Sequence, residues 1–292
     1  MNLRLDHAGW SAGIEPGCGG SVSRLDWNGI AVLRPAPPGA TSPLRMASFP
    51  LLPFANRIAN GRFGPHRLPR NFGDHPHALH GNGWQSIWTA EPPGEDRVRL
   101  RLEHDGGESW PWRYAAVQDI ELVAGLARFR IELTNRDSRS MPAGLGFHPY
   151  FPLYPETRLM ACAEAVWLTD EEQLPVHRAD AAHFGNWAAG SPVAGKGLID
   201  NAYAGWDGAA RIEQPGLVLE IEASGAHAFH LYRPEREDFF CFEPVSHLPD
   251  AHNRPAFLLD RLEPGESLAL EMRIAVRSRT AIGSGPCPCR DR

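Results

Sequence analysis

The sequence predicts an all-β protein built as a large antiparallel β-sandwich. Four segments alternate apolar and polar residues with a period of two, namely residues 97–104, 127–135, 217–223 and 267–276. Successive side chains of a strand point to opposite faces, so this pattern is typical of strands with one face in a core and the other in water. The 29 glycines and 27 prolines favour many turns between short strands.

Each of these segments places its apolar residues on a single face. In residues 97–104, Val98, Leu100 and Leu102 alternate with arginines. The inward residues expected in the later segments are Phe129, Ile131 and Leu133, then Leu219 and Ile221, then Leu268, Leu270, Met272 and Ile274. Helical periodicity is scarce, and the best helical candidate, residues 168–175, is short and ends at a proline.

Strand-like segments continue to about Val276 without a charged or low-complexity linker. We therefore expect a single domain over residues 1–278, followed by an unstructured tail over residues 279–292. Two loop-rich stretches stand out, residues 35–78 and 154–200. Long loops on a β scaffold are where binding and catalytic residues usually lie.

Composition and charge narrow the class of partner. The chain carries 29 basic and 35 acidic residues, a net charge of −6, which disfavours nucleic acid. No run of about 18 apolar residues exists to span a membrane, and no N-terminal apolar stretch indicates a signal peptide. The five cysteines are odd in number and scattered, which favours free thiols. We expect a cytoplasmic monomer or homodimer.

Two apparent ligand motifs lack the context that they need. Residues 190–197, GSPVAGKG, imitate a phosphate-binding loop, but Gly197 replaces the residue that would bind magnesium and no buried strand precedes it. His75, His77 and His80 lie close together, yet their spacing matches no zinc motif. We therefore expect no cofactor and no metal. His80 differs from the other two because a glycine-rich turn and a tryptophan follow it, which suits a ligand.

Four further polar residues stand among apolar ones. Asn56 and Arg57, in PFANRIANGRF, either hold hydroxyl groups or close a loop through backbone carbonyls. His148, in GLGFHPYFPL, is costly to bury unless it has a partner or a chemical role. Glu243 follows the apolar run FFCF, so it is either held by an arginine or poised for chemistry.

A fifth polar residue is Asp200, which follows two apolar residues in LIDNAYAGWDG. Its sequence context alone favours an Asx-turn.

The order of these blocks resembles that of the aldose 1-epimerase (galactose mutarotase) family. The series is PFANRIANGRF, LHGNGW, GFHPYF, LIDNAYAGW and CFEPVSHLPDA, preceded by GCGGSVSRLDWNGIAVLRP. The forms PLLPFANRI and HGNGW are similar to a bacterial branch of that family. The resemblance implies a galactose mutarotase-like supersandwich and an isomerase that interconverts the α and β anomers of a free aldose.

The resemblance also implies roles for individual residues. It assigns catalysis to His148 and Glu243, and sugar binding to Asn56, Arg57, His80 and Asp200. From their reference pKa values we expect an ionised Glu243 to take the proton of the C1 hydroxyl. We expect a protonated His148 to donate a proton to the ring oxygen. His80 is a second candidate for the position at the ring oxygen.

Two alternatives follow from the same residues. Arg62, Arg67 and Arg70 suit a phosphate, which would indicate a hexose-6-phosphate 1-epimerase, unless they form a solvated basic loop. A non-catalytic sugar-binding protein on the same fold is the other alternative, because fold does not fix function. The presence of both His148 and Glu243 argues against it. In each case the partner is a small sugar.

Overall fold

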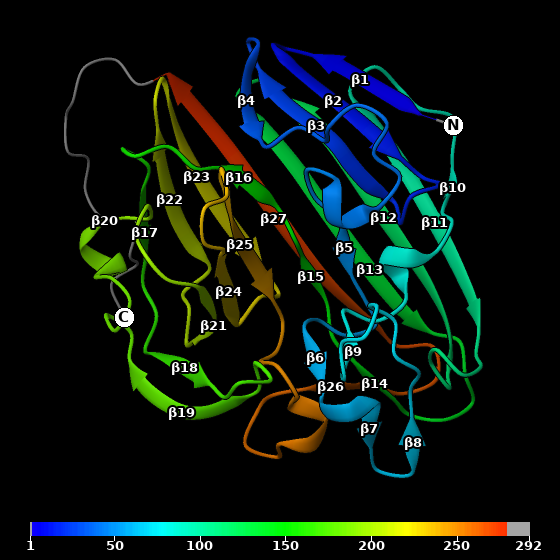
Figure 1. Cartoon of the computed structure of the whole chain (residues 1–292). Coiled ribbons are helices and arrows are strands. Elements are labelled where there is room, and N and C mark those ends of the chain that lie inside the picture. Colours follow the sequence, from blue (N-terminus) through cyan, green and yellow to red (C-terminus); the bar gives the residue numbers. More distant parts are fainter. Residues whose placement is uncertain (1, 279–292) are drawn as a thin grey trace.

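The computed structural model describes residues 2–278 and confirms the all-β prediction. Within these residues there is no α-helix, only short 3₁₀ turns at Pro43–Arg45, Ala59–Gly61, Gly83–Gln85, Trp187–Ala189 and Ala251–Asn253. The rest of the ordered structure is strands, arranged in two large sheets and several small ones (Figure 1). No helix in this part of the chain has the length and apolarity to cross a membrane.

The larger sheet has nine strands and contains all four segments that alternate in sequence. Across the sheet these are β10 (Thr89–Ala90), β11 (Arg97–Asp105), β12 (Arg113–Val123), β13 (Leu126–Asn135), β27 (Ser267–Ser278), β23 (Leu217–Ser224), β22 (Ala209–Gln214), β17 (Arg158–Ala161) and β20 (Ser191–Pro192). The predicted alternation of buried and solvent-facing residues is clearest in β11 and β13.

The second large sheet has eight strands and carries most of the polar blocks. Its order is β19 (Pro175–Asp180), β18 (Ala165–Thr169), β21 (Ile199–Ala204), β24 (Ala228–Arg233), β25 (Phe239–Val245), β15 (Gly146–Phe147) and β5 (Pro50–Leu51), with β16 (Tyr150–Pro152) paired to β25. All residues of β25 are buried. A strand buried on both faces explains why this segment reads as an apolar run rather than an alternation.

Smaller sheets complete the fold. An N-terminal sheet contains β1 (Leu3–His7), β2 (Trp10–Glu15), β3 (Ser21–Trp27) and β4 (Ile30–Leu33). Three pairs join β14 (Met141–Ala143) to β26 (Asp260–Leu262), β6 (Arg57–Ile58) to β9 (Ala78–Leu79), and β7 (Arg62–Phe63) to β8 (His66–Arg67). The indole N–H of Trp10 in β2 donates to the Val123 carbonyl, which ties the N-terminal sheet to β12.

One continuous apolar core joins the two large sheets. Leu100 and Ile131 of the nine-stranded sheet and Leu231 of the eight-stranded sheet are fully buried in it. Phe129 of β13 contacts Phe147 of β15 edge to face, with ring centroids 6.2 Å apart. The apolar faces predicted from the sequence therefore meet across the sandwich.

The predicted helix at residues 168–175 is wrong. The segment forms a hairpin between β18 and β19. The Asp170 side chain accepts hydrogen bonds from the backbone N–H groups of Glu172 (3.0 Å) and Leu174 (2.9 Å), and Gln173 has a φ of 64°. An aspartate that bonds its own following backbone favours a turn over a helix.

The loop that imitates a phosphate-binding motif is held by an arginine. The Arg233 guanidinium donates to the backbone carbonyls of Val193, Lys196 and Gly197 at 2.6–2.9 Å. These residues therefore present carbonyls to a cation, whereas a phosphate site needs backbone N–H groups.

The prediction of free thiols is met at two of the described cysteines. Cys18 and Cys241 are free. The prediction is wrong for Cys162, which is disulfide-bonded. A disulfide depends on two cysteines approaching in space, and the sequence spacing does not reveal that approach. The predicted tail, residues 279–292, lies outside the described residues.

The alternation in β11 yields a stability prediction. Leu100→Ala should lower the free energy of unfolding by about 2–5 kcal/mol, because Leu100 is fully buried and its removal leaves a cavity. Arg101→Ala should cost less than about 1 kcal/mol, because its ion pair with Glu91 is solvent-exposed. Equilibrium urea unfolding measures both, and equal losses would contradict the assignment of faces.

Candidate active site

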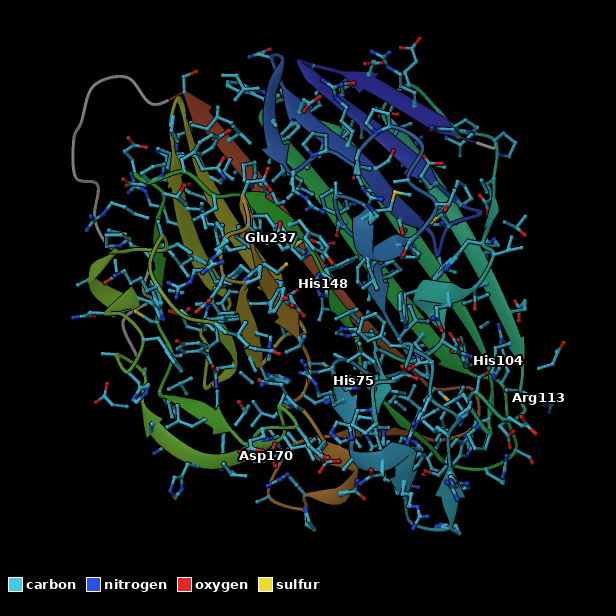
Figure 2. All side chains as sticks on the ribbon, viewed as in Figure 1. His75, His104, Arg113, His148, Asp170 and Glu237 are labelled. Atoms are coloured by element: carbon cyan, nitrogen blue, oxygen red, sulfur yellow. The ribbon has the colours of Figure 1, made fainter. Side chains whose placement is uncertain are left out.

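The six site residues predicted from the sequence line one cavity. It has a volume of about 300 Å³ and opens beside β24 and β25. In Figure 2, His148 lies near the middle of the molecule, beside β15. The lining residues include Asn56, Arg57, His80, His148, Asp200 and Glu243. Residues up to 187 positions apart in sequence (from 56 to 243) thus meet at one site.

His148 and Glu243 are in contact on the cavity wall. The Nε2 atom of His148 lies 3.3 Å from Oε1 of Glu243. Glu243 comes from β25, whereas His148 lies between β15 and β16, which both pair with β25. The Glu243 side chain is 2% exposed and that of His148 is 8% exposed. The pair therefore offers two proton-exchanging groups in a dry environment.

Aromatic rings fix the orientation of His148. Its imidazole is stacked on Phe49, with centroids 4.5 Å apart, and on Tyr150, with centroids 4.8 Å apart. The backbone N–H of His148 donates to the Phe49 carbonyl at 3.0 Å. The aromatic neighbours that made this histidine unusual in the sequence thus limit its rotamers.

Burial sets the protonation of this pair. It raises the pKa of the Glu243 carboxyl well above its usual value, and the negative charge of Asp200 adds to this rise. Burial likewise lowers the pKa of His148 to about 3, helped by the charge of His230. Without a sugar, burial therefore favours the neutral form of both the Glu243 carboxyl and the His148 imidazole. These pKa shifts oppose the expected ionised glutamate and protonated histidine, because desolvation disfavours both charges.

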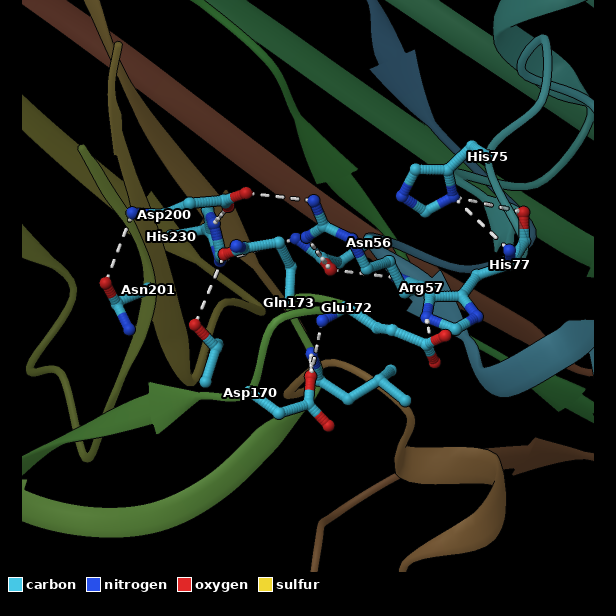
Figure 3. Close-up of polar contacts among 12 residues, drawn as sticks. Asn56, Arg57, His75, His77, Asp170, Glu172, Gln173, Asp200, Asn201 and His230 are labelled. Atoms are coloured by element: carbon cyan, nitrogen blue, oxygen red, sulfur yellow. Dashed lines mark hydrogen bonds and ion pairs between the residues drawn. The ribbon is translucent and has the colours of Figure 1, made fainter. Parts of the chain in front are cut away.

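A closed ring of hydrogen bonds forms another part of the cavity lining (Figure 3). Arg57 donates to Asn56 Oδ1 at 3.0 Å and to Asp200 Oδ2 at 2.9 Å. His230 Nε2 lies 2.6 Å from Asp200 Oδ1, and His230 Nδ1 lies 3.3 Å from the Asn56 amide nitrogen. We call these four residues the polar ring. Each holds the next in place.

The polar ring keeps Asp200 ionised. Burial alone would raise the pKa of Asp200, but its hydrogen bond with His230 and the charge of Arg57 lower it below its usual range. The aspartate is therefore a fixed acceptor whose two oxygens are already oriented. Asp200 lies in β21 and is not the Asx-turn residue that its sequence context alone favoured.

His80 is positioned by the backbone beside Asn56. The Asn56 N–H donates to His80 Nδ1 at 3.1 Å, and the His80 N–H donates to the Asn56 carbonyl at 2.8 Å. A side chain at the following Gly81 would place its Cβ 2.0 Å from the Leu52 carbonyl oxygen, so only glycine fits there. Burial, followed by the charge of His148, lowers the pKa of His80 well below its usual value.

The other histidines of this segment lie outside the cavity lining. His77 is fully buried, accepts from the Asn60 N–H at 3.0 Å, and has Nε2 3.7 Å from a Glu172 carboxylate oxygen. His75 contacts His77 rather than the cavity (Figure 3). The three histidines therefore do not converge on one point.

The three arginines considered for phosphate also lie outside this lining. Arg62, Arg67 and Arg70 are exposed. A second depression, of about 360 Å³, covers the outer face of β11–β13. It contains ion pairs such as Arg99–Asp119 and shares no lining residue with the first cavity.

Sequence reasoning missed His230. It lies in AFHLYR, a wholly ordinary strand sequence, and faces Glu243 directly in the pairing of β24 with β25. The cavity also has aromatic lining that was not predicted, from Phe72, Tyr232 and Phe239. The only sequence signal for His230 is an isolated histidine in an apolar strand, and the strand register is needed to interpret it.

His247 positions the Asn56 segment from the side of the core. Its Nε2 accepts from the Ala55 N–H at 3.0 Å, and its Nδ1 lies 2.8 Å from the Leu248 carbonyl. These partners require the neutral tautomer with the proton on Nδ1. A Cβ on Gly144 would lie 2.1 Å from the His247 ring, so glycine is needed there.

Comparison with known proteins identifies the family. The aldose 1-epimerase family matches residues 2–275, and the chain belongs to this family. The Escherichia coli K12 protein YphB, which is uncharacterized, is 36% identical over 251 residues, covering 78% of this chain and 83% of YphB.

Solved structures show the same fold. A candidate aldose 1-epimerase from Escherichia coli K12 superposes with a TM-score of 0.88 and 32% identity, over 95% of this chain and 99% of that one. A galactose mutarotase-like protein from Clostridium acetobutylicum gives a TM-score of 0.84 with 19% identity, over 95% of each chain. The predicted galactose mutarotase-like sandwich is therefore confirmed.

His247 gives a prediction for stability against pH. Burial lowers its folded-state pKa to about 4, whereas the unfolded chain titrates near 6.5, so the unfolded state binds the proton first as pH falls. Lowering the pH from 7 to 5 should therefore reduce the free energy of unfolding by about 2 kcal/mol through this residue alone. His247→Gln should remove this share of the pH dependence. Urea unfolding at both pH values tests it, and an unchanged pH dependence in the variant would contradict it.

Proposed function

We propose that this protein is an aldose 1-epimerase that interconverts the α and β anomers of a free aldose. The observation that carries the proposal is the contact of His148 with Glu243 on the wall of a cavity that also holds the polar ring. A cavity of about 300 Å³ is at the small end of the range for ligand pockets, which suits one monosaccharide.

Mutarotation opens the sugar ring, rotates the C1–C2 bond and closes the ring on the other face of the carbonyl. Opening needs a base for the C1 hydroxyl proton and an acid for the ring oxygen. The His148–Glu243 pair holds one exchangeable proton, the minimum for this task. Because burial favours the neutral pair before the sugar binds, the sugar must first favour its charged form.

We propose that the bound sugar supplies this change. Glu243 Oε2 has no hydrogen-bond partner among the described residues, so it can accept a sugar hydroxyl. A hydrogen bond to the carboxylate favours ionisation and moves the proton to His148. Glu243 then takes the C1 proton while His148 gives one to the ring oxygen, and the roles reverse on closure. His80, 5.3 Å from His148 between ring centroids, stays beside the same oxygen.

The polar ring would hold the remaining hydroxyl groups. Arg57 offers donors, and Asp200 offers oriented acceptor oxygens. These groups are fixed before the sugar arrives, so little ordering remains to be done when it binds. Phe72, which is 40% exposed at the cavity, and Phe239 offer flat apolar surfaces to the C–H groups of the sugar.

A panel of substrates separates this proposal from its alternatives. Fresh α-anomers of aldoses, followed by polarimetry, should equilibrate faster with the protein present. A preference for hexose 6-phosphates would favour the phosphorylated substrate instead. Binding of an aldose with no faster anomer exchange would indicate a sugar-binding protein.

Glu243→Gln should reduce kcat by about 10²–10⁴-fold, because the amide cannot take the C1 proton. The fold should be retained, since burial favours an uncharged Glu243 in the empty cavity and glutamine has nearly the same shape. Glu237→Gln is the matched control, because Glu237 is an exposed carboxylate in the turn before β25 (Figure 2). Polarimetry gives the rates. Wild-type turnover in Glu243→Gln would remove this residue from the mechanism.

His230→Leu should raise KM by about tenfold or more, with a smaller change in kcat. It breaks the hydrogen bonds to Asp200 and Asn56, and a buried hydrogen bond to a charged group contributes about 1.5–3 kcal/mol. His227→Leu, an exposed histidine at the start of the same segment, is the control. Initial rates over a range of aldose concentrations separate KM from kcat. An unchanged KM would show that His230 does not position the sugar-binding groups.

A further inference from the structure

A buried thiol lies against the His148–Glu243 pair. Cys241 precedes Glu243 by two residues on β25, so both side chains point to the same face of the strand. One donor atom from each of His148, Cys241 and Glu243 lies within 4.8 Å of the other two. Cys241 is a free thiol with no exposed surface. Three different metal-ligating groups therefore converge beside the cavity.

Two polar atoms in this cluster lack partners. Glu243 Oε2 and His148 Nδ1 are buried and make no hydrogen bond within the described residues. The two residues are 1% and 6% exposed. Buried polar atoms are nearly always hydrogen-bonded, so unpaired ones call for a ligand or a function. A sugar hydroxyl can satisfy the carboxylate, but a thiol two residues away is not needed for that role.

The donor set has a distinct metal preference. Thiolate, imidazole and carboxylate together suit zinc, which commonly takes three protein ligands and leaves a fourth position open. Magnesium and calcium prefer oxygen ligands alone. Donors within 4.8 Å of one another surround a common centre. Side-chain shifts of under about 1 Å would bring them to the ~2.0–2.3 Å bonds of zinc.

We propose that His148, Cys241 and Glu243 form a zinc-binding site, and that zinc inhibits the protein by occupying the acid–base pair. Zinc would displace one proton from the thiol and one from the carboxylic acid, and both would pass to solvent. The inhibition part of this inference rests on the proposed epimerase function. The binding part rests on the cluster alone. Zinc and sugar would exclude one another, because both need Glu243.

Inhibition is tested by zinc titration of the mutarotation rate. Metal-free wild-type protein should lose activity as Zn²⁺ is added, and a chelator should restore it, whereas Mg²⁺ should have no effect. Cys241→Ser should keep its activity without metal but need at least tenfold more Zn²⁺ for the same inhibition. Cys18→Ser, which changes the other free cysteine described, should respond like the wild type. Equal sensitivity of Cys241→Ser and the wild type would overturn the proposal.

Binding is tested separately with Co²⁺, which replaces zinc and gives a thiolate-to-metal absorption band. The band should form with the wild type and be absent in Cys241→Ala. No band in the wild type would overturn the zinc site, even in an active epimerase. A band that depends on Cys241, in a protein that accelerates no anomer exchange, would retain the zinc site and overturn the proposed function.

Discussion

The polar ring is the constraint on which the site depends. Its four residues come from three separate parts of the chain, namely Asn56 and Arg57, Asp200, and His230. Each is hydrogen-bonded to the next. All four sit at the cavity with little exposed surface, so the loss of one leaves a buried group without its partner, which is costly. The ring also explains why the pKa of Asp200 is lowered while that of the neighbouring Glu243 is raised. Two carboxyl groups in one cavity thus differ because only one has fixed partners.

The contrast between these carboxyl groups suits the site to the proposed proton transfer. Asp200 is a permanent acceptor and is suited to binding. Glu243 is desolvated, and the charge of Asp200 further opposes its ionisation. A group that ionises only when a ligand arrives is suited to moving a proton, because its charge can change during the reaction. The stacking of His148 between Phe49 and Tyr150 keeps the second partner of the transfer in a single orientation.

Local patterns in the sequence predict the fold well, and the site only in part. The alternation in β11 and β13 reflects burial on one face and is visible in any such strand. Asp170 overrides the weak helical signal through its own hydrogen bonds. The blocks around His148 and Glu243 are identified by resemblance, but the charges on those residues depend on three-dimensional burial. His230 becomes meaningful only through its register opposite Glu243, which no local pattern encodes.

The burial that suits the site to the proposed proton transfer also suits it to the proposed metal binding. A buried carboxylate and imidazole without full hydrogen bonding bind whatever supplies the missing partner, whether a sugar hydroxyl or a cation. Cys241 distinguishes between these outcomes, because a thiol adds little to sugar binding and much to the affinity for a soft metal. Its position next to the pair favours thiophilic cations, while hard cations such as magnesium gain nothing from it. Cys241 and Glu243, two residues of the buried strand β25, therefore carry the two proposed properties, zinc inhibition and proton transfer.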